Sequence, residues 1–439
     1  MPIRRIMAVA SAAGVAAHSI AAGALAQSSS YSTNGDSTLA ALITEALERN
    51  PGVQQAFLEH QAAQSRIAQA GTLPNPALSF THHVRGPQTR VGPQMSSLSI
   101  SQAFPWMGTL SDSREVAAAE SAILGESYAE RRAEIVRQVK LAYYDLAYLD
   151  EALRITEEEE HLLLHYEALA RARYSQGFGQ QREVVKLQAE ATRVLNRRQE
   201  LSRQRTDLEA ILNILVNRSV DAIVGTVQVD ARPVAVADNE RLHAIALGHR
   251  PELRSARLRI EGGEHAVRLA RSRYRPELTV GIAWGNVLDR RDGPGVAAPP
   301  LDDGQDQFSF TFGASLPVFR SSYDAGVREA GAHLAAADEA YRDAINGVAL
   351  AVRTTAFGLR TLEGQLALFE RALLPQAEQA LLTTEEAYSG GVTGVLELLD
   401  SEEVLLDVRL GLARLRADYM RALAEMERAI GSAFPEEGS

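Results

Sequence analysis

The sequence predicts a mainly helical fold with additional membrane-spanning strands, built from two copies of one unit. Three observations support this fold class. Two similar turn motifs, at residues 174–179 and 388–394, each lie between two long helical patterns. Each copy also holds two short segments in which apolar and polar residues alternate, which is typical of strands. The order of helices, strands and turn is the same in both copies, and an internal repeat outranks most other signals in a sequence.

The composition excludes several classes of function. The chain has 439 residues, of which 46% are hydrophobic, and its formal net charge is -11. An acidic chain without a basic stripe is a poor partner for nucleic acid. The chain holds no cysteine, which excludes disulfides, thiolate metal sites, cysteine nucleophiles and a lipid on an N-terminal cysteine.

Residues 1–26 have the features of a secretory signal peptide. Two arginines precede a short apolar run, and an Ala-Leu-Ala cleavage sequence stands before Gln27. The apolar run is shorter than the roughly 20 residues that a membrane-spanning helix needs. We therefore expect cleavage and export, with an uncleaved amphipathic arm as the alternative. A serine-rich, flexible segment is expected over residues 27–37.

The first copy is predicted to occupy residues 38–217. It holds a helix, two strands, a long helix and a return helix, with expected bounds at residues 38–71, 77–84, 97–104 and 110–173 and an end near Asn217. Asn50-Pro51 indicates a break inside the first helix, because proline disfavours a helical residue before it. In the long helix and the return helix, apolar residues recur in steps of three and four, the spacing of a coiled-coil seam.

The second copy is predicted over residues 238–431, after a linker at 218–237 and before a tail at 432–439. Its strands are expected near residues 277–284 and 308–316, with a loop rich in Gly, Pro and Asp between them. A second long helix follows, and Pro375 is expected to kink it.

The four strands are too few to close a barrel alone. They have about the length of transmembrane strands, but single-chain barrels in outer membranes begin at about 8 strands and lipid does not tolerate open sheet edges. Three chains with four strands each would supply 12. The expected assembly is a trimeric α-barrel continued by a shared 12-stranded β-barrel. The alternative is a soluble antiparallel coiled-coil protein with short β-hairpins packed at its end.

Catalytic and metal-binding signatures are weak or absent in the sequence. It contains no nucleophile elbow, zinc-protease motif, P-loop or dinucleotide fingerprint, so we expect no enzyme and no cofactor. His161 and His165 share a helix face and are weak metal candidates. A charged, solvated helix face is the favoured interpretation of that stretch.

Several short motifs, in the order in which they occur here, resemble those of the TolC family of outer-membrane efflux channels. The resemblance extends over nearly the whole mature chain. The motifs are Asn50-Pro51, Leu73-Pro74-Asn75-Pro76, residues 102–108, the two Tyr-Ser-x-Gly turns and residues 396–400. The Pro-Asn-Pro and Phe-Pro-Trp phrases look most like the CzcC/CusC-like branch, which serves heavy-metal and other cation efflux. Gln27 stands where many relatives carry a lipidated cysteine, and the basic residue often seen after Gly108 is missing.

The resemblance implies a homotrimer in the outer membrane, with a periplasmic helical extension. It also implies a passive exit duct that docks onto a periplasmic adaptor protein and an inner-membrane pump of the resistance-nodulation-division type. Heavy-metal cations would be the substrate. Multidrug export and type I secretion are alternatives within the class, and a periplasmic coiled-coil adaptor or scaffold is the alternative outside it.

The resemblance further implies that the turns close like an iris and carry a selectivity gate. Four carboxylates follow the second turn, and in a ring of three chains each inward carboxylate becomes three charges around one axis. Among them, the gate candidates are Glu397, Asp400 and Glu403, and their counterparts in the first copy are Glu183 and Lys186. The alternative is a solvated acidic helix start that the helix dipole favours.

The two turns are also the candidate docking surface for the adaptor. The residues expected to contribute are Tyr174, Gly177, Tyr388 and Gly391. The alternative is a helix reversal without a partner, for which glycine is suited because it accepts positive φ.

Overall fold

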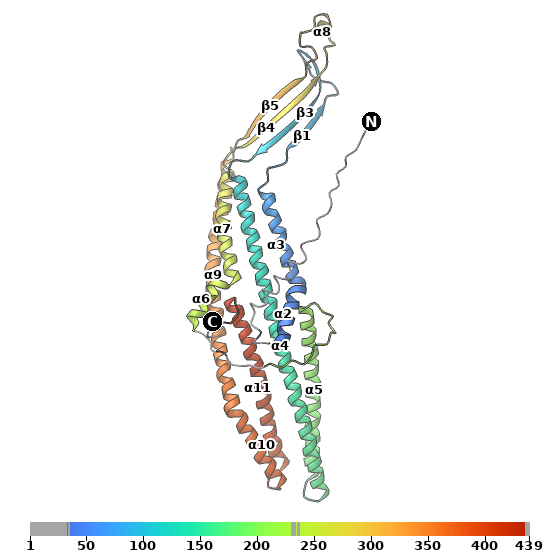
Figure 1. Cartoon of the computed structure of the whole chain (residues 1–439), viewed down its shortest axis with the longest axis vertical. Helices are drawn as coiled ribbons and strands as arrows, with labels where there is room; N and C mark the ends of the chain where they lie inside the picture. Colours follow the sequence, from blue (N-terminus) through green and yellow to red (C-terminus); the bar gives the residue numbers. More distant parts are fainter. Residues whose placement is uncertain (1–32, 34–35, 230–233, 235–237, 435–439) are drawn as a thin grey trace. The chain divides into compact units, whose positions relative to one another are not determined.

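The structure is a computed structural model that describes residues 33, 36–229, 234 and 238–434, and it divides into two units (Figure 1). The helical unit comprises Met1–Ala56, Tyr128–Glu252 and Ala344–Ser439, and the sheet unit comprises Phe57–Ser127 and Leu253–Asp343. The predicted signal peptide, most of the segment before residue 38, and parts of the predicted linker and tail lie outside the described residues.

The helices follow the predicted order. Their bounds are α2 (Ser37–Arg49), α3 (Pro51–Ala70), α4 (Thr109–Ser175), α5 (Gln181–Leu215), α6 (Asn239–His249), α7 (Pro251–Ser272), α8 (Gly293–Ala297), α9 (Arg320–Leu368), the π-helical turn η1 (Phe369–Leu373), α10 (Leu374–Ser389) and α11 (Val395–Ile430). Within the described part of the chain, none of the helices is both long enough and apolar enough to cross a membrane.

Asn50 produces the break between α2 and α3. Its side-chain carbonyl accepts a hydrogen bond from the N–H of Gly52 at 2.9 Å, and its amide donates to the carbonyl of Leu215 at 2.9 Å. Pro51 follows at the first helical position, where the missing N–H needs no partner. The predicted break is therefore confirmed, and Pro251 begins α7 in the same way in the second copy.

The irregularity expected at Pro375 takes the form of the π-helical turn η1. Proline cannot donate a backbone hydrogen bond, and its ring crowds the carbonyl four residues earlier. The helix widens over Phe369–Leu373, directly before Pro375, and then resumes as α10. Gly411 of α11 leaves room for the Phe369 ring, since a Cβ there would lie 2.9 Å from it.

The sheet unit contains one antiparallel sheet with strand order β1-β3-β4-β5. The strands are β1 (Ala77–His82), β2 (Gln88–Thr89), β3 (Gly92–Phe104), β4 (Glu277–Val287) and β5 (Gln307–Ser315), and β2 pairs with the start of β3. Strand β3 of the first copy pairs with β4 of the second copy, with Ile100 opposite Ile282. The two copies therefore share one sheet.

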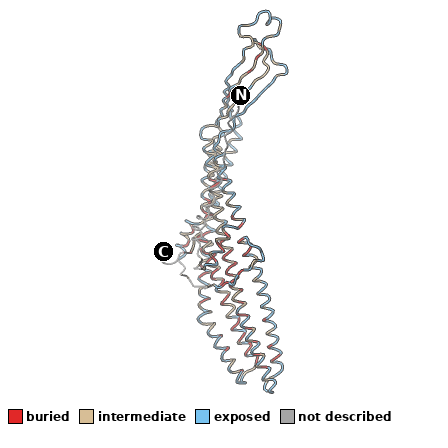
Figure 2. The backbone as a smooth tube through the Cα atoms, turned by 45° about the vertical axis from the view of Figure 1, so that its right-hand side comes forward, coloured by how far each residue is buried: buried red, intermediate tan, exposed pale blue. Residues whose placement is uncertain are grey.

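One face of this sheet is apolar and exposed. Residues that lie opposite one another across strands point to the same face. One such row contains Leu78, Ile100, Ile282 and Phe310, with exposed fractions of 70%, 43%, 52% and 76%. The neighbouring row on the other face consists of Ser79, Ser99, Ala283 and Ser309. Figure 2 shows the strands as exposed or half-buried along most of their length.

The core of the helical unit joins the two hairpins α4/α5 and α10/α11. Its buried side chains come from all four helices and include Leu163, Leu187, Leu381 and Leu398. Figure 2 shows the corresponding buried stretches of these helices. Deeper in the unit, Lys140 of α4 forms a buried ion pair with Glu427 of α11. Apolar residues of both hairpins therefore pack into a common core.

Candidate functional site

The two predicted turns have the same backbone geometry and lie at one end of the helical unit (Figure 1). Gly177 and Gly391 adopt φ of 81° and 75°, a left-handed conformation that only glycine adopts at little cost. In each turn the next N–H donates back into the preceding helix at 2.9 Å, to the carbonyl of Arg173 or of Ala387. This is the hydrogen bond that closes a helix end before a reversal.

A contact between Arg173 and Tyr388, which we name the tip clasp, connects the two turns. The guanidinium of Arg173 lies over the Tyr388 ring, 4.8 Å from its centroid, and donates to the Tyr388 carbonyl. Tyr388 is 1% exposed, and its hydroxyl has no hydrogen-bond partner in the described structure. Sequence analysis missed Arg173, because a lone arginine at the end of a helix carries no distinctive pattern.

The four predicted docking residues occupy different environments. Tyr174 is 47% exposed, whereas Tyr388 is buried in the tip clasp. The two tyrosines align in the repeat but do not present the same surface. The large exposed side chains beside the turns are instead Phe178 and Val392, at 78% and 81%.

The predicted gate carboxylates lie on the exposed side of α11. Glu397, Asp400 and Glu403 are exposed, while Leu398 and Leu399 between them are buried. Glu397 also accepts a hydrogen bond from the N–H of Gly394 at 3.3 Å, so it helps to cap its own helix.

The first-copy counterparts differ from this arrangement in charge. Glu183 repeats the capping role, accepting from the N–H of Gln180 at 3.5 Å, near the limit for a hydrogen bond. Lys186 is exposed, and among the described residues no ion pair joins it to Asp400. The surface carboxylates after the second turn therefore lack a matching set after the first.

The fourth carboxylate after the second turn, Glu402, is buried at 7% exposure. Its carboxyl interacts electrostatically with Glu159 of α4 and Arg197 of α5. The sequence signal that would have separated it from its neighbours is its place in the apolar seam of α11.

The weak metal candidates His161 and His165 are both exposed on α4. Over the described residues, no group of three or more His, Asp or Glu side chains is arranged to hold a metal ion.

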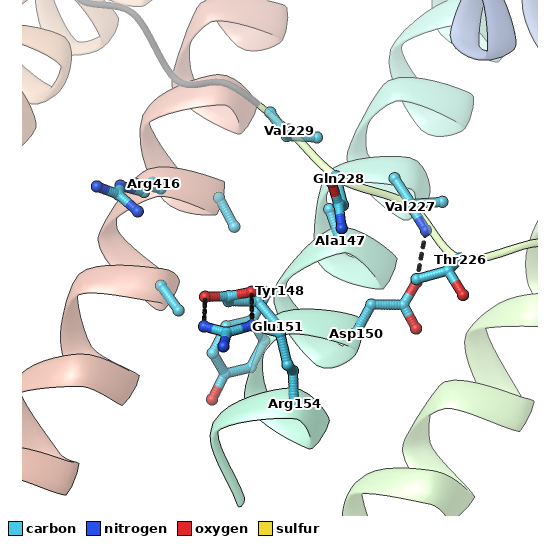
Figure 3. A pocket seen from close by; sticks show the side chains of 12 residues that line it. Ala147, Tyr148, Asp150, Glu151, Arg154, Thr226, Val227, Gln228, Val229 and Arg416 are labelled. Carbon is cyan, nitrogen blue, oxygen red and sulfur yellow. Dashed lines mark hydrogen bonds and ion pairs between the residues drawn. The ribbon is translucent and has the colours of Figure 1, made fainter. Parts of the chain in front are cut away.

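A cleft of about 360 Å³ lies in the helical unit between α4, α11 and residues 226–229 (Figure 3). Its charged side chains are paired: Arg154 contacts Glu151 at 2.6 Å, and Arg416 contacts Glu370 at 2.8 Å. Asp150 accepts a hydrogen bond from the N–H of Val227 at 2.7 Å. These contacts attach the chain after α5 to the helices and leave no activated nucleophile in the cleft.

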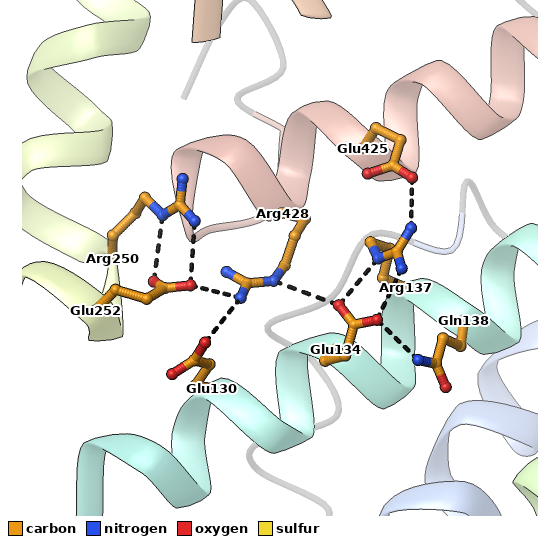
Figure 4. A network of polar contacts seen from close by, with 8 residues as sticks. All are labelled: Glu130, Glu134, Arg137, Gln138, Arg250, Glu252, Glu425 and Arg428. Atoms are coloured by element: carbon orange, nitrogen blue, oxygen red, sulfur yellow. Dashed lines mark hydrogen bonds and ion pairs between the residues drawn. The ribbon is translucent and has the colours of Figure 1, made fainter. Parts of the chain in front are cut away.

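A second polar network fixes the end of α11 that is remote from the turns (Figure 4). Arg428 contacts Glu252 at 2.5 Å and also approaches Glu134 and Glu130 at 3.8 and 3.6 Å. Burial would raise the pKa of Glu252, but hydrogen bonds from Arg250 and Arg428 hold it at about 2. The network therefore stays charged at neutral pH and ties α11 to α4 and to the start of α7.

The comparisons with known proteins agree with one another on the fold. The model of the family described as "Outer membrane efflux protein" matches residues 42–217 and 242–432. Nodulation protein T of Rhizobium leguminosarum bv. trifolii is 21% identical, over 91% of this chain and 86% of its own length.

Two solved structures illustrate the likeness. The outer membrane protein VceC of Vibrio cholerae has a TM-score of 0.75 and 21% identity, over 91% of this chain and 97% of VceC. The CusC channel has a TM-score of 0.71 and 16% identity, over 90% of this chain and 92% of CusC. The predicted helical channel fold is therefore confirmed, without a preference for the CzcC/CusC-like branch. The chain is not an enzyme and belongs to the outer membrane efflux protein family.

Proposed function

We propose that this chain forms the passive exit duct of a tripartite efflux system in the outer membrane. It acts as a homotrimer, together with a periplasmic adaptor protein and an inner-membrane pump of the resistance-nodulation-division type. One observation carries the proposal: in a chain of the efflux channel family, two hairpins end in matched turns beside a group of exposed carboxylates.

The sheet supports both the membrane location and the association of several copies. Its apolar row is exposed, which suits contact with lipid, and its other face carries small polar residues that suit water. Strands β1 and β5 are each paired on one side only within the described residues. Copies placed edge to edge would pair these strands and remove the exposed edges.

The turns supply a gate and a docking surface in this proposal. Around a threefold axis, Glu397, Asp400 and Glu403 become rings of negative charge that attract cations. The adaptor contacts the outward side of the turns, where Phe178, Val392 and Tyr174 are exposed and Gly177 and Gly391 allow a close approach.

The proposed substrates are heavy-metal cations. The acidic turn end favours cations over anions, and the Pro-Asn-Pro phrase resembles the cation-efflux branch. Multidrug export and type I secretion also fit the family. Deletion of the gene should therefore raise sensitivity to heavy metals more than to dyes or antibiotics, and lost drug resistance with unchanged metal tolerance would favour the multidrug alternative.

Single-channel recording in planar bilayers tests the proposed mechanism. The wild-type protein should form cation-selective pores, and the double variant Glu397→Gln with Asp400→Asn should reduce the cation-to-anion permeability ratio several-fold. Glu240→Gln removes an exposed carboxylate from α6 and serves as the control, because it lies away from the turns. An unchanged ratio in the double variant would refute the gate, and a protein that forms no pores would refute the channel.

A further inference from the structure

Two glutamates occupy core positions in the seams that hold the two hairpins together. On α11, Glu402 falls in the run of buried residues Val395, Leu398, Glu402 and Leu405, in steps of three and four. On α4, Glu159 falls between Ile155 and Leu163, which are also buried. Such positions normally take apolar residues, because an ionised carboxylate loses its hydration there.

The two carboxyls share one nearby arginine. Arg197 of α5 contacts Glu159 at 3.0 Å, and the charge of Arg197 also acts on Glu402. Both glutamates are 7% exposed. Glu402 forms no hydrogen bond within the described residues, and Arg197 is the nearby charge that favours its ionised form.

The other charged groups around the pair are mostly acidic. Glu190 of α5 acts on both carboxyls, Asp407 of α11 acts on Glu159, and Glu403 acts on Glu402. Tyr166 of α4 faces Glu402 and donates its hydroxyl to Glu385 of α10. One arginine therefore faces an excess of negative charge from α4, α5, α10 and α11.

Burial and this excess make the pair sensitive to protons near neutral pH. Burial, together with the carboxyl of Glu159, raises the pKa of Glu402 to about 8. Burial also raises the pKa of Glu159 to about 7, although Arg197 opposes the shift. An acid whose pKa is raised by folding stabilises the fold less as the pH rises through that value. The packing of α11 on α4 and α5 should therefore weaken progressively as the pH rises from about 4.5 to about 8.

We propose that Glu402 and Glu159 form a proton-dependent latch between the hairpins α4/α5 and α10/α11, closed while at least one carboxyl is protonated and loosened when both are ionised beside Arg197. Because the latch lies near the turns, its release would ease their separation. That last step rests on the proposed function, in which the turns are the gate.

The internal repeat shows that the two carboxyls of the latch have no counterparts at the repeat-related positions. Aligned through Tyr174 and Tyr388, the counterpart of Glu402 is Gln188, and the counterpart of Glu159 is Leu373. Gln188 is exposed and donates to Glu167 at 2.8 Å. The repeat-related positions thus lack the pair of carboxyls, so the helical unit does not need it simply to fold a hairpin.

Spin labels on the full-length protein in detergent can measure the latch directly. The chain has no cysteine, so Val185→Cys on α5 and Leu396→Cys on α11 place one label on each hairpin, both at exposed sites. Labelled protein is diluted with unlabelled protein so that distances within one subunit dominate. Pulsed electron resonance should show the distance distribution shifting to longer values as the pH rises from about 5 to about 8, with no further shift once both carboxyls are ionised.

Three variants separate the latch from a general effect of pH. Glu402→Gln should keep the short distance and abolish the shift, while Glu403→Gln, at the exposed neighbour, should leave the shift unchanged. Glu159→Gln should also keep the short distance, because its amide, like that of Glu402→Gln, imitates a carboxyl that stays protonated. A wild-type distribution that ignores pH, or a Glu402→Gln protein that responds like wild type, would overturn the latch. A clear pH response in a protein that forms no pores would instead overturn the proposed function alone.

Discussion

Removal of Arg173 should release the tip clasp and open the proposed gate. A cation over an aromatic ring contributes about 0.5–2 kcal/mol, and a hydrogen bond from a charged donor contributes about 1.5–3 kcal/mol. Arg173 is half-buried, so water screens part of this energy, and we take about 2 kcal/mol for the clasp. Since about 1.4 kcal/mol corresponds to a factor of ten, Arg173→Ala should shift the balance between closed and open states about 30-fold per subunit.

Open probability in planar bilayers measures this shift, with Arg171→Ala as the matched control. Arg171 lies on the same helix, is 64% exposed and pairs only with Glu167 of its own helix among the described contacts. Such a surface pair contributes about 0.3–0.5 kcal/mol, so its loss should barely change gating. Tyr388→Phe should keep the clasp, because the Tyr388 hydroxyl has no partner to lose in the described structure. Equal open probabilities for Arg173→Ala and Arg171→Ala would refute the reasoning.

Three further predictions concern the helical unit. Gly391→Ala should destabilise the turn by about 1–2 kcal/mol because its φ is positive, whereas Gly390→Ala, at a φ of -74°, should not; thermal melting compares the two. Lys140→Met should cost about 3–5 kcal/mol by leaving Glu427 buried and unpaired, and adding Glu427→Leu should restore most of the loss, as denaturant unfolding would show. Glu252 has a pKa lowered to about 2, so its contribution to the free energy of unfolding is complete above about pH 4.5 and is lost as the pH falls towards 2. A Glu252→Gln protein that loses stability in acid as steeply as wild type would contradict this.

The repeated elements were the part of the fold that the sequence predicted best. The alignment of Gly177 with Gly391 rests on a backbone requirement that few residues meet, and both turns have the expected left-handed residue. The break at Asn50-Pro51 likewise follows from local chemistry. In contrast, the π-helical form of the irregularity before Pro375 depends on how the widened turn packs against α11, and no local pattern specifies that.

The candidate site was predicted less completely, because burial depends on partners that are distant in sequence. Glu402 and Glu403 are neighbours of identical chemistry, but one is buried and the other exposed. Tyr174 and Tyr388 align in the repeat, but only Tyr388 meets an arginine from the other copy. The period of the helix could have separated the two glutamates, since Glu402 continues the apolar seam. The tip clasp had no such signal.

Among the polar sites along α4 that connect the first copy to the second, three become less protected towards the turns. The ion pair of Lys140 with Glu427 is the most remote from them, and Lys140 is 2% exposed. Glu159 and Glu402 follow at 7%, and the half-buried Arg173 forms the last contact. Local opening starts where packing and burial are weakest. If the proposed gate opens by separation of the two hairpins, the motion should therefore begin at the tip clasp, continue only when the glutamate pair loses its protons, and stop at the buried ion pair.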